Sequence, residues 1–118
     1  MPKCIITAVE SVKEGKTLAD VRAAWEHVAA MAAETEGMQS FQSSWNEESK
    51  TCLVTEVFDG PANYLAFLGK VDMALVSQAI QFESLTLQCA SDQVAGFGDV
   101  IANFGIKVYL TDGCAGNL

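Results

Sequence analysis

The chain has 118 residues, the size of a single domain, because chains divide into separate cores only above roughly 250 residues. Half of the residues are hydrophobic and 19% are charged, a composition typical of a folded globular protein. The 15 acidic residues outnumber the 7 basic ones, and the resulting net charge of −8 argues against nucleic acid and anionic membranes as partners.

Two features of the sequence indicate where the protein is located in the cell and which class of ligand it binds. No segment approaches the roughly 20 apolar residues of a membrane helix, and an alternating pattern opens the chain where a signal peptide would be uniformly apolar, so we expect a cytoplasmic protein. Arg22 is the only arginine, so one subunit offers no pair of guanidinium groups for a phosphate. A neutral or apolar ligand is favoured.

The first half of the chain predicts three strands and a helix. Residues 3–12 alternate as a strand with apolar side chains on both faces. Thr17 and Asp20 form a capping-box pattern, and a helical repeat then runs until Gly37 stops the chain. Residues 38–46 and 51–58 alternate as two strands, and the polar link between them predicts a hairpin.

The second helix is predicted from its start signal. Asp59-Gly60-Pro61 is a cap followed by proline, and Gly69 predicts a kink or a break. The buried stripe of this helix is expected at Tyr64, Phe67, Leu68, Val71 and Leu75. A strand over residues 82–89 follows, so the element order is β-α-β-β-α-β. This order predicts an α+β, ferredoxin-like fold, an antiparallel sheet with both helices on one face.

The remaining residues form a C-terminal appendage, 91–118, on a core of residues 3–90, within one domain spanning 1–118. Asp92 is predicted to cap a helix that ends at Gly105, and residues 106–110 alternate as a last strand. That helix carries an apolar stripe of Val94, Phe97, Ile101 and Phe104. The appendage is therefore expected to pack onto the domain.

The sheet face opposite the helices also needs cover. It carries Ile5, Val9, Leu53 and Val57, and apolar residues on both sides of a sheet must be buried on both sides. A second copy of the chain is the expected cover, so we predict a homodimer with an apolar interface.

The sequence resembles the dimeric α/β-barrel family that includes antibiotic-biosynthesis-type (ABM-like) and haem-degrading monooxygenases. The resemblance covers roughly residues 3–90 and is carried by Val12-Lys13-Glu14-Gly15-Lys16, the Glu36-Gly37 helix end, and Glu56-Val57-Phe58-Asp59 leading to Ala62. It implies a dimeric barrel that holds a polyketide, quinol or haem between sheet and helices. The monooxygenases use dioxygen without a metal or flavin, so no cofactor and no metal site is expected.

The resemblance also implies site residues. Glu56 and Phe58 fall on the helix-facing side of their strand, Glu56 as the candidate catalytic residue and Phe58 as a ligand contact. Trp25, Tyr64 and Phe67 lie on helix faces directed at the sheet and complete the predicted ligand-binding set, or alternatively form core. The second helix lacks the histidine common in quinone-type members. The Asn, Trp and His of the haem-degrading branch are also missing, at Ala8, Phe58 and about Leu68.

Other chemistry-bearing side chains have simpler interpretations. His27, the only histidine, projects away from the apolar stripe of the first helix, which indicates a surface residue. Cys4, Cys52, Cys89 and Cys114 lack the spacing of a redox or zinc pair and are interpreted as reduced thiols. Glu56 itself is either a proton acceptor or ligand anchor, or a buried group paired within the fold.

Three functions remain open. The expected function is binding of a small apolar or aromatic ligand between the sheet and the helices. The first alternative is a cofactor-independent monooxygenase of a quinol or aromatic substrate, and the second is a structural dimer without a ligand. The absent histidine and the single arginine favour binding or structure over oxygenation.

Overall fold

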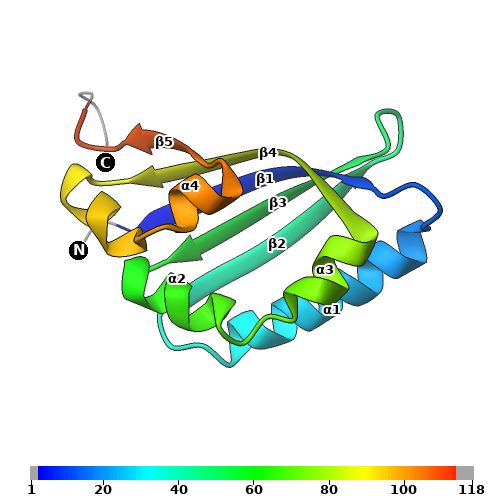
Figure 1. Cartoon of the computed structure of the whole chain (residues 1–118), viewed down its shortest axis with the longest axis horizontal. Coiled ribbons are helices and arrows are strands. Elements are labelled where there is room, and N and C mark those ends of the chain that lie inside the picture. Colours follow the sequence, from blue (N-terminus) through cyan, green and yellow to red (C-terminus); the bar gives the residue numbers. More distant parts are fainter. Residues whose placement is uncertain (1–2, 114–118) are drawn as a thin grey trace.

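One sheet of five strands organises the chain, and the structure, a computed structural model, describes residues 3–113 (Figure 1). The strands are β1 (Cys4–Val12), β2 (Met38–Asn46), β3 (Thr51–Phe58), β4 (Ile80–Cys89) and β5 (Lys107–Leu110). They lie in the order β2-β3-β1-β4-β5. The first four pair antiparallel in ferredoxin-like order, which confirms the predicted α+β fold. Because β5 pairs parallel with β4, the sheet is mixed, and it is not closed.

The first helix, α1 (Leu18–Ala33), begins at the predicted capping box. The Thr17 side chain accepts a hydrogen bond from the Asp20 amide at 3.3 Å, and the Asp20 carboxylate accepts one from the Thr17 amide at 2.8 Å. The helix ends earlier than predicted, and Gly37, with φ +85°, lies in the turn into β2. There the Asn63 side chain donates to the Glu36 carbonyl at 2.9 Å, in the space that a Cβ on Gly37 would occupy.

The second helical segment breaks as Gly69 predicts. It consists of α2 (Pro61–Leu68) and α3 (Met73–Ala79), and the Asp72 side chain caps α3 by accepting from the Leu75 amide at 3.2 Å. The break changes the helical phase, so Val76 is buried where the sequence predicted Leu75. With α1, these two helices cover one face of the sheet (Figure 1).

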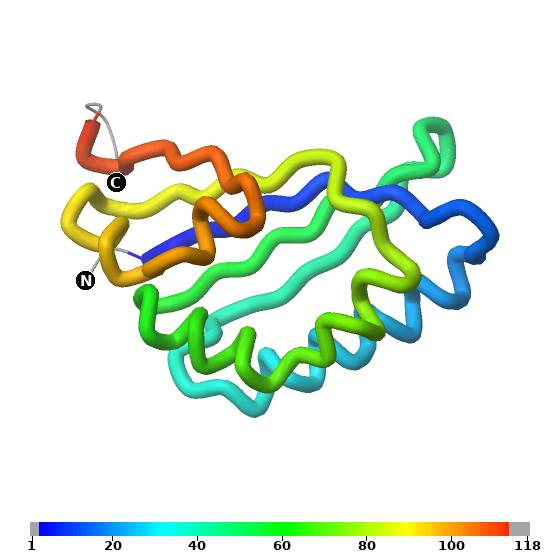
Figure 2. The backbone as a smooth tube through the Cα atoms, in the orientation of Figure 1, coloured from blue at the N-terminus to red at the C-terminus, as the bar shows by residue number. Residues whose placement is uncertain are grey.

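The C-terminal segment folds back onto the domain, as predicted, but not as one helix. It forms a 3₁₀ helix, η1 (Ser91–Phe97), then α4 (Val100–Phe104) and β5, with a sharp turn between the helices at Gly98, whose φ is +59°. Asp92 is not the N-cap of η1, because the helix begins at Ser91 and Asp92 lies inside its first turn. The side chain of Gln93 accepts from the amide of Ala90, the N-cap residue, at 2.8 Å. Figure 2 shows the chain returning along the β4 edge of the sheet.

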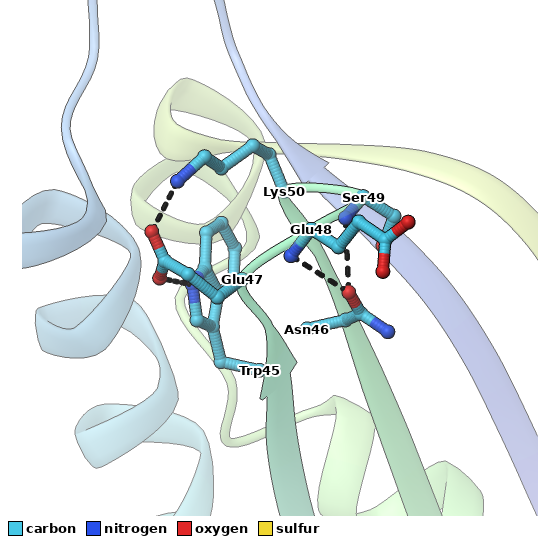
Figure 3. A network of polar contacts seen from close by, with 6 residues as sticks. All are labelled: Trp45, Asn46, Glu47, Glu48, Ser49 and Lys50. Carbon is cyan, nitrogen blue, oxygen red and sulfur yellow. Dashed lines mark hydrogen bonds and ion pairs between the residues drawn. The ribbon is translucent and has the colours of Figure 1, made fainter.

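The predicted hairpin between β2 and β3 is held by side-chain contacts in its turn (Figure 3). Asn46 Oδ1 accepts from the amides of Glu48 and Ser49, each at 2.9 Å. Glu47 accepts from Trp45 Nε1 at 2.8 Å and also pairs with Lys50, whose own φ is +56°. These contacts keep the edge strand β2 in register with β3.

The two faces of the sheet differ in cover. Facing the helices, alternate residues of β1, β3 and β4 are buried: Cys4, Ile6, Ala8, Glu10, Cys52, Val54, Glu56, Phe58, Leu87 and Cys89. On the other face Ile5, Val9 and Val57 are only half-buried and Leu53 is 49% exposed. None of the helices in residues 3–113 is long and apolar enough to cross a membrane.

Candidate functional site

A partly enclosed cavity of about 70 Å³ lies between the sheet and the helices. Its floor includes Ala8 and Val54 of the central strands, and the helices contribute mostly apolar side chains. Phe104 and Ile106 of the C-terminal segment also line it, although the family resemblance ends near residue 90. Within this apolar wall are two carboxyl groups, those of Glu10 and Glu56.

Four of the five predicted site residues line this cavity, namely Glu56, Trp25, Tyr64 and Phe67. Phe58 does not. It is fully buried, stacks on Tyr64 with ring centroids 4.8 Å apart, and lies edge-on to Phe97. The expected ligand contact at Phe58 is therefore corrected to a core position, because Phe97 of η1 fills the space beside it.

Glu56 has no hydrogen-bond partner in the described part of the chain, whereas Glu10 has one. It lies on β3 opposite Ile6 of β1 and is 8% exposed, and its oxygens, which make no hydrogen bond to any residue between 3 and 113, keep some accessible surface. Burial, assisted by the charge of Glu10, raises the pKa of Glu56 to about 8. The side chain is therefore mostly a neutral carboxylic acid at pH 7, and it can donate a hydrogen bond.

Glu10 was not predicted as a site residue. Its Oε1 accepts a hydrogen bond from Trp25 Nε1 at 3.0 Å, so β1 and α1 meet through this pair at the cavity. Burial raises the pKa of Glu10, and the Trp25 hydrogen bond partly opposes that rise. The sequence contains a pattern that indicates this position, because residue 10 continues the alternation of Cys4, Ile6 and Ala8 onto the buried face.

Tyr64 brings a hydroxyl group to the same cavity from α2. The residue is 7% exposed, and its hydroxyl has no hydrogen-bond partner in the described part of the chain. Burial and the nearby Glu56 raise the pKa of Tyr64 well above its ordinary value. The hydroxyl is therefore a permanent donor at neutral pH.

His27 lies outside the cavity and is half-buried rather than on the surface. Its Nε2 accepts a hydrogen bond from the amide of Asp72 at 2.8 Å, which connects α1 to the start of α3. This acceptor role requires the neutral imidazole with its proton on Nδ1. His27 therefore has a structural partner that the helical periodicity did not indicate.

The three described cysteines, Cys4, Cys52 and Cys89, are buried and unpaired. Burial raises the pKa of both Cys4 and Cys52 to about 11, with the neighbouring Cys89 and Glu10 adding to the respective effects. They pack as small hydrophobic side chains. The prediction for Cys114 falls outside the described residues. Within residues 3–113 no three His, Cys, Asp or Glu side chains gather as a metal site requires.

Comparisons with known proteins find similarity in structure only. No family model matches the sequence, and no curated protein sequence matches it. MupZ from Pseudomonas fluorescens superimposes with a TM-score of 0.83 at 11% identity, covering 99% of this chain and 96% of MupZ. SnoaB from Streptomyces nogalater, a cofactor-independent oxygenase, gives 0.59 at 16% identity, covering 74% of this chain and 91% of SnoaB.

A candidate antibiotic biosynthesis monooxygenase from Chloroflexus aurantiacus gives the same TM-score of 0.59, also at 16% identity, covering 73% of this chain and 90% of its own. The match to MupZ differs from these two in extending over nearly the whole chain, which includes the C-terminal segment. At these identities the likeness establishes the fold and no more. The chain has the fold of the antibiotic-biosynthesis-monooxygenase-like proteins, as its resemblance to them predicted.

Proposed function

We propose that this protein binds a small, mainly apolar molecule in the cavity between the sheet and the helices. The observation that carries the proposal is the Glu56 carboxyl group, which is buried in an apolar wall and has no hydrogen-bond partner within residues 3–113. No inaccessible side-chain nitrogen or oxygen within residues 3–113 lacks a hydrogen-bond partner, so the unpartnered Glu56 oxygens keep accessible surface. Because Glu56 lines the cavity, a ligand there can hydrogen-bond to this carboxyl group.

The size of the cavity limits the guest. Its 70 Å³ is several times the roughly 10–15 Å³ that one water needs, yet well below the roughly 300 Å³ at which drug-sized pockets begin. This is about half of the roughly 150 Å³ of an apolar cavity that holds one benzene ring, so a ring-sized guest must extend through the open side of the cavity. Phe82 and Phe104 line the cavity while remaining 36% and 37% exposed, which places them at that open side.

The proposal includes a homodimer in which a second copy covers the open face of the sheet. Ile5, Val9, Leu53 and Val57 lie there side by side in the register of β1 with β3. The flanking strands add uncharged residues at the same level, including Gln42, Ser44, Thr86 and Gln88. Lys107, opposite Thr86 on β5, and Glu83, bonded to Ser11, are charged residues at its margins. An extended face that is partly apolar and uncharged along β1 and β3 suits a permanent interface. The buried, unpaired cysteines suit a reducing compartment such as the cytoplasm.

A cavity-filling variant tests the binding function. Ala8→Leu places three more carbons on the cavity floor, where Ala8 is buried, and Ala30→Leu on the exposed side of α1 adds the same volume elsewhere. Calorimetric titration with 2-naphthol should give binding in the wild type and Ala30→Leu, and at least about tenfold weaker binding in Ala8→Leu. Equal affinity in all three proteins would place binding outside the cavity, and no binding by any of them favours a structural dimer without a ligand.

A cofactor-independent monooxygenase acting on a quinol or aromatic substrate is the second candidate. The fold shared with SnoaB favours it, and Glu56 is the group that would take the substrate proton once deprotonated. Oxygen uptake with naphthohydroquinone measures this activity directly. Uptake above the spontaneous rate that is lost in Glu56→Gln supports oxygenation, and a rate equal to buffer alone contradicts it.

A further inference from the structure

Beyond binding, we infer that Glu10, Glu56 and Tyr64 form an acid–base site that moves a proton within an apolar α,β-unsaturated ketone. This inference rests on the proposed function, because it names the class of ligand and what happens to it. Its geometry comes from three side chains on three elements, β1, β3 and α2, that line one cavity.

The acid end of the site consists of Glu56 and Tyr64. Both side chains are more than nine-tenths buried. Neither the Glu56 carboxyl group nor the Tyr64 hydroxyl group has a hydrogen-bond partner in the described part of the chain. They are close enough for the charge of Glu56 to raise the pKa of Tyr64. At neutral pH both groups keep their protons, so they offer two donors to one acceptor. A neutral carboxylic acid and a phenol in an apolar site can together stabilise a developing enolate oxygen.

The base end is Glu10. Trp25 Nε1 can only donate, so its hydrogen bond to Oε1 favours the charged form of Glu10 and fixes the direction of the carboxylate. No residue in the range 3–113 donates to the other carboxylate oxygen. The negative charge of Glu10 also contributes to the raised pKa of Glu56. Burial raises the pKa of Glu10 as well, but the Trp25 hydrogen bond opposes that rise, so Glu10 is assigned as the base and Glu56 as the acid.

The strand register sets the spacing of the two ends. Glu56 lies opposite Ile6, and Glu10 lies four residues further along β1, a backbone separation of about 13 Å at about 3.3 Å per residue, from which both side chains reach one cavity. The Ala8–Val54 pair forms the apolar floor between them. A substrate in this space would meet the acid at one end and the base at the other. A proton remote from the carbonyl group is acidic only when conjugation links the two, which points to the γ-hydrogen of an enone.

The step needs no oxidant or added reactant. Glu10 takes the γ-hydrogen as a proton, and the C–H electron pair becomes a Cβ–Cγ double bond. The former Cα–Cβ double bond moves to lie between Cα and the carbonyl carbon, and the carbonyl π pair forms an O–H bond with the proton of Glu56. Return of the enol proton to Glu56, with reprotonation at a carbon atom, regenerates both carboxyl groups and gives an exchanged or isomerised ketone.

Deuterium exchange tests this step directly. The protein is incubated in D₂O with isophorone or α-ionone, two apolar enones that carry γ-hydrogens, and loss of the γ-hydrogen signals is followed by proton NMR. We expect exchange well above the buffer rate, reduced about 100-fold or more in Glu10→Gln and in Glu56→Gln. Tyr64→Phe, which removes one donor to the oxyanion, should lower the rate about 100-fold. The matched control is Glu14→Gln, an exposed residue of the turn before α1, which should exchange at the wild-type rate.

Two further measurements separate catalysis from structure. Glu10→Gln retains an acceptor for Trp25, so circular dichroism should show a folded protein with its exchange activity lost. The wild-type exchange rate should fall above pH 8 as Glu56 ionises, and the exchange rate of Glu56→Gln should not show this fall.

If calorimetry shows the enones bound without exchange, the binding function stands and the acid–base inference fails. If neither enone binds or exchanges, the inference fails, and the 2-naphthol titration decides the binding function alone.

Discussion

Phe97 lies edge-on against Phe58, with ring centroids 6.1 Å apart and ring planes at 74°. This contact joins η1 of the C-terminal segment to the end of the central strand β3. Tyr64 belongs to the same aromatic cluster, 4.8 Å from Phe58 and 6.2 Å from Phe97 between centroids. The segment therefore supports the side chain of Tyr64 from behind, while Phe104 and Ile106 of the same segment reach the cavity.

Phe97→Ala should destabilise the protein by about 3–5 kcal/mol, because it leaves a cavity in place of a fully buried aromatic ring. The free energy of unfolding is measured by urea titration. Leu110→Ala in β5 is the control, since Leu110 is 43% exposed and its truncation should cost less than about 1 kcal/mol. A Phe97→Ala protein within 1 kcal/mol of the wild type would show that η1 does not stabilise the core.

Local sequence signals predicted the core elements well. The alternation of β2 and β3 and the polar turn between them predicted both strands with the bounds that the structure has. Gly69 predicted the break between α2 and α3, although not the phase change that buries Val76. These features depend on neighbouring residues, so periodicity alone could find them.

The corrections concern contacts between distant parts of the chain. Phe58 lies on the predicted face, but only the fold shows that Phe97, 39 positions later, occupies the space beside it. The turn at Gly98 divides the predicted C-terminal helix, because a left-handed φ cannot continue it. Glu10 continues the alternation of β1 onto the buried face, but a carboxyl group does not show up in a pattern of apolar residues. His27 has a partner at Asp72, across a helix break whose geometry the sequence does not specify.

The described cysteines should resist thiol reagents in the folded state. With a pKa of about 11 for Cys4 and Cys52, only about one thiol in a thousand is ionised at pH 8, and both are buried. In a Cys114→Ser background, a disulfide-exchange reagent such as DTNB should react slowly with the native protein and titrate three thiols after unfolding in urea. Rapid modification of any thiol in the native variant would contradict this expectation.

Val57→Lys should disrupt the proposed homodimer, because it places a charge among the apolar residues of the open sheet face, opposite Ile5. Burying an unpaired ammonium group at an apolar interface costs several kcal/mol. Sedimentation equilibrium at micromolar concentration should show a dimer for the wild type and for Ala30→Lys, a matched charge on the exposed side of α1. The Val57→Lys protein should be monomeric or unfolded. A monomeric wild type would contradict the proposed dimer.

The stability of the protein should fall as pH rises from 5.5 to 7.5. The pKa of Glu56 is about 8 in the folded state and close to 4.5 when the chain is unfolded, so between these values the native state holds a proton that the unfolded state has lost. Unfolding then becomes easier by about 1.4 kcal/mol for each pH unit, and the raised pKa of Glu10 acts with the same sign. Urea titrations at both pH values, at one protein concentration, measure the slope.

Glu56→Gln isolates the contribution of this one group. The amide cannot ionise, so the variant should lose most of the decline between pH 5.5 and 7.5 and become more stable than the wild type at the higher pH. Glu14→Gln, on the exposed turn before α1, should keep the wild-type slope. An unchanged slope in Glu56→Gln would mean that Glu56 is already ionised in the folded protein, and the acid role assigned to it would fail with that result.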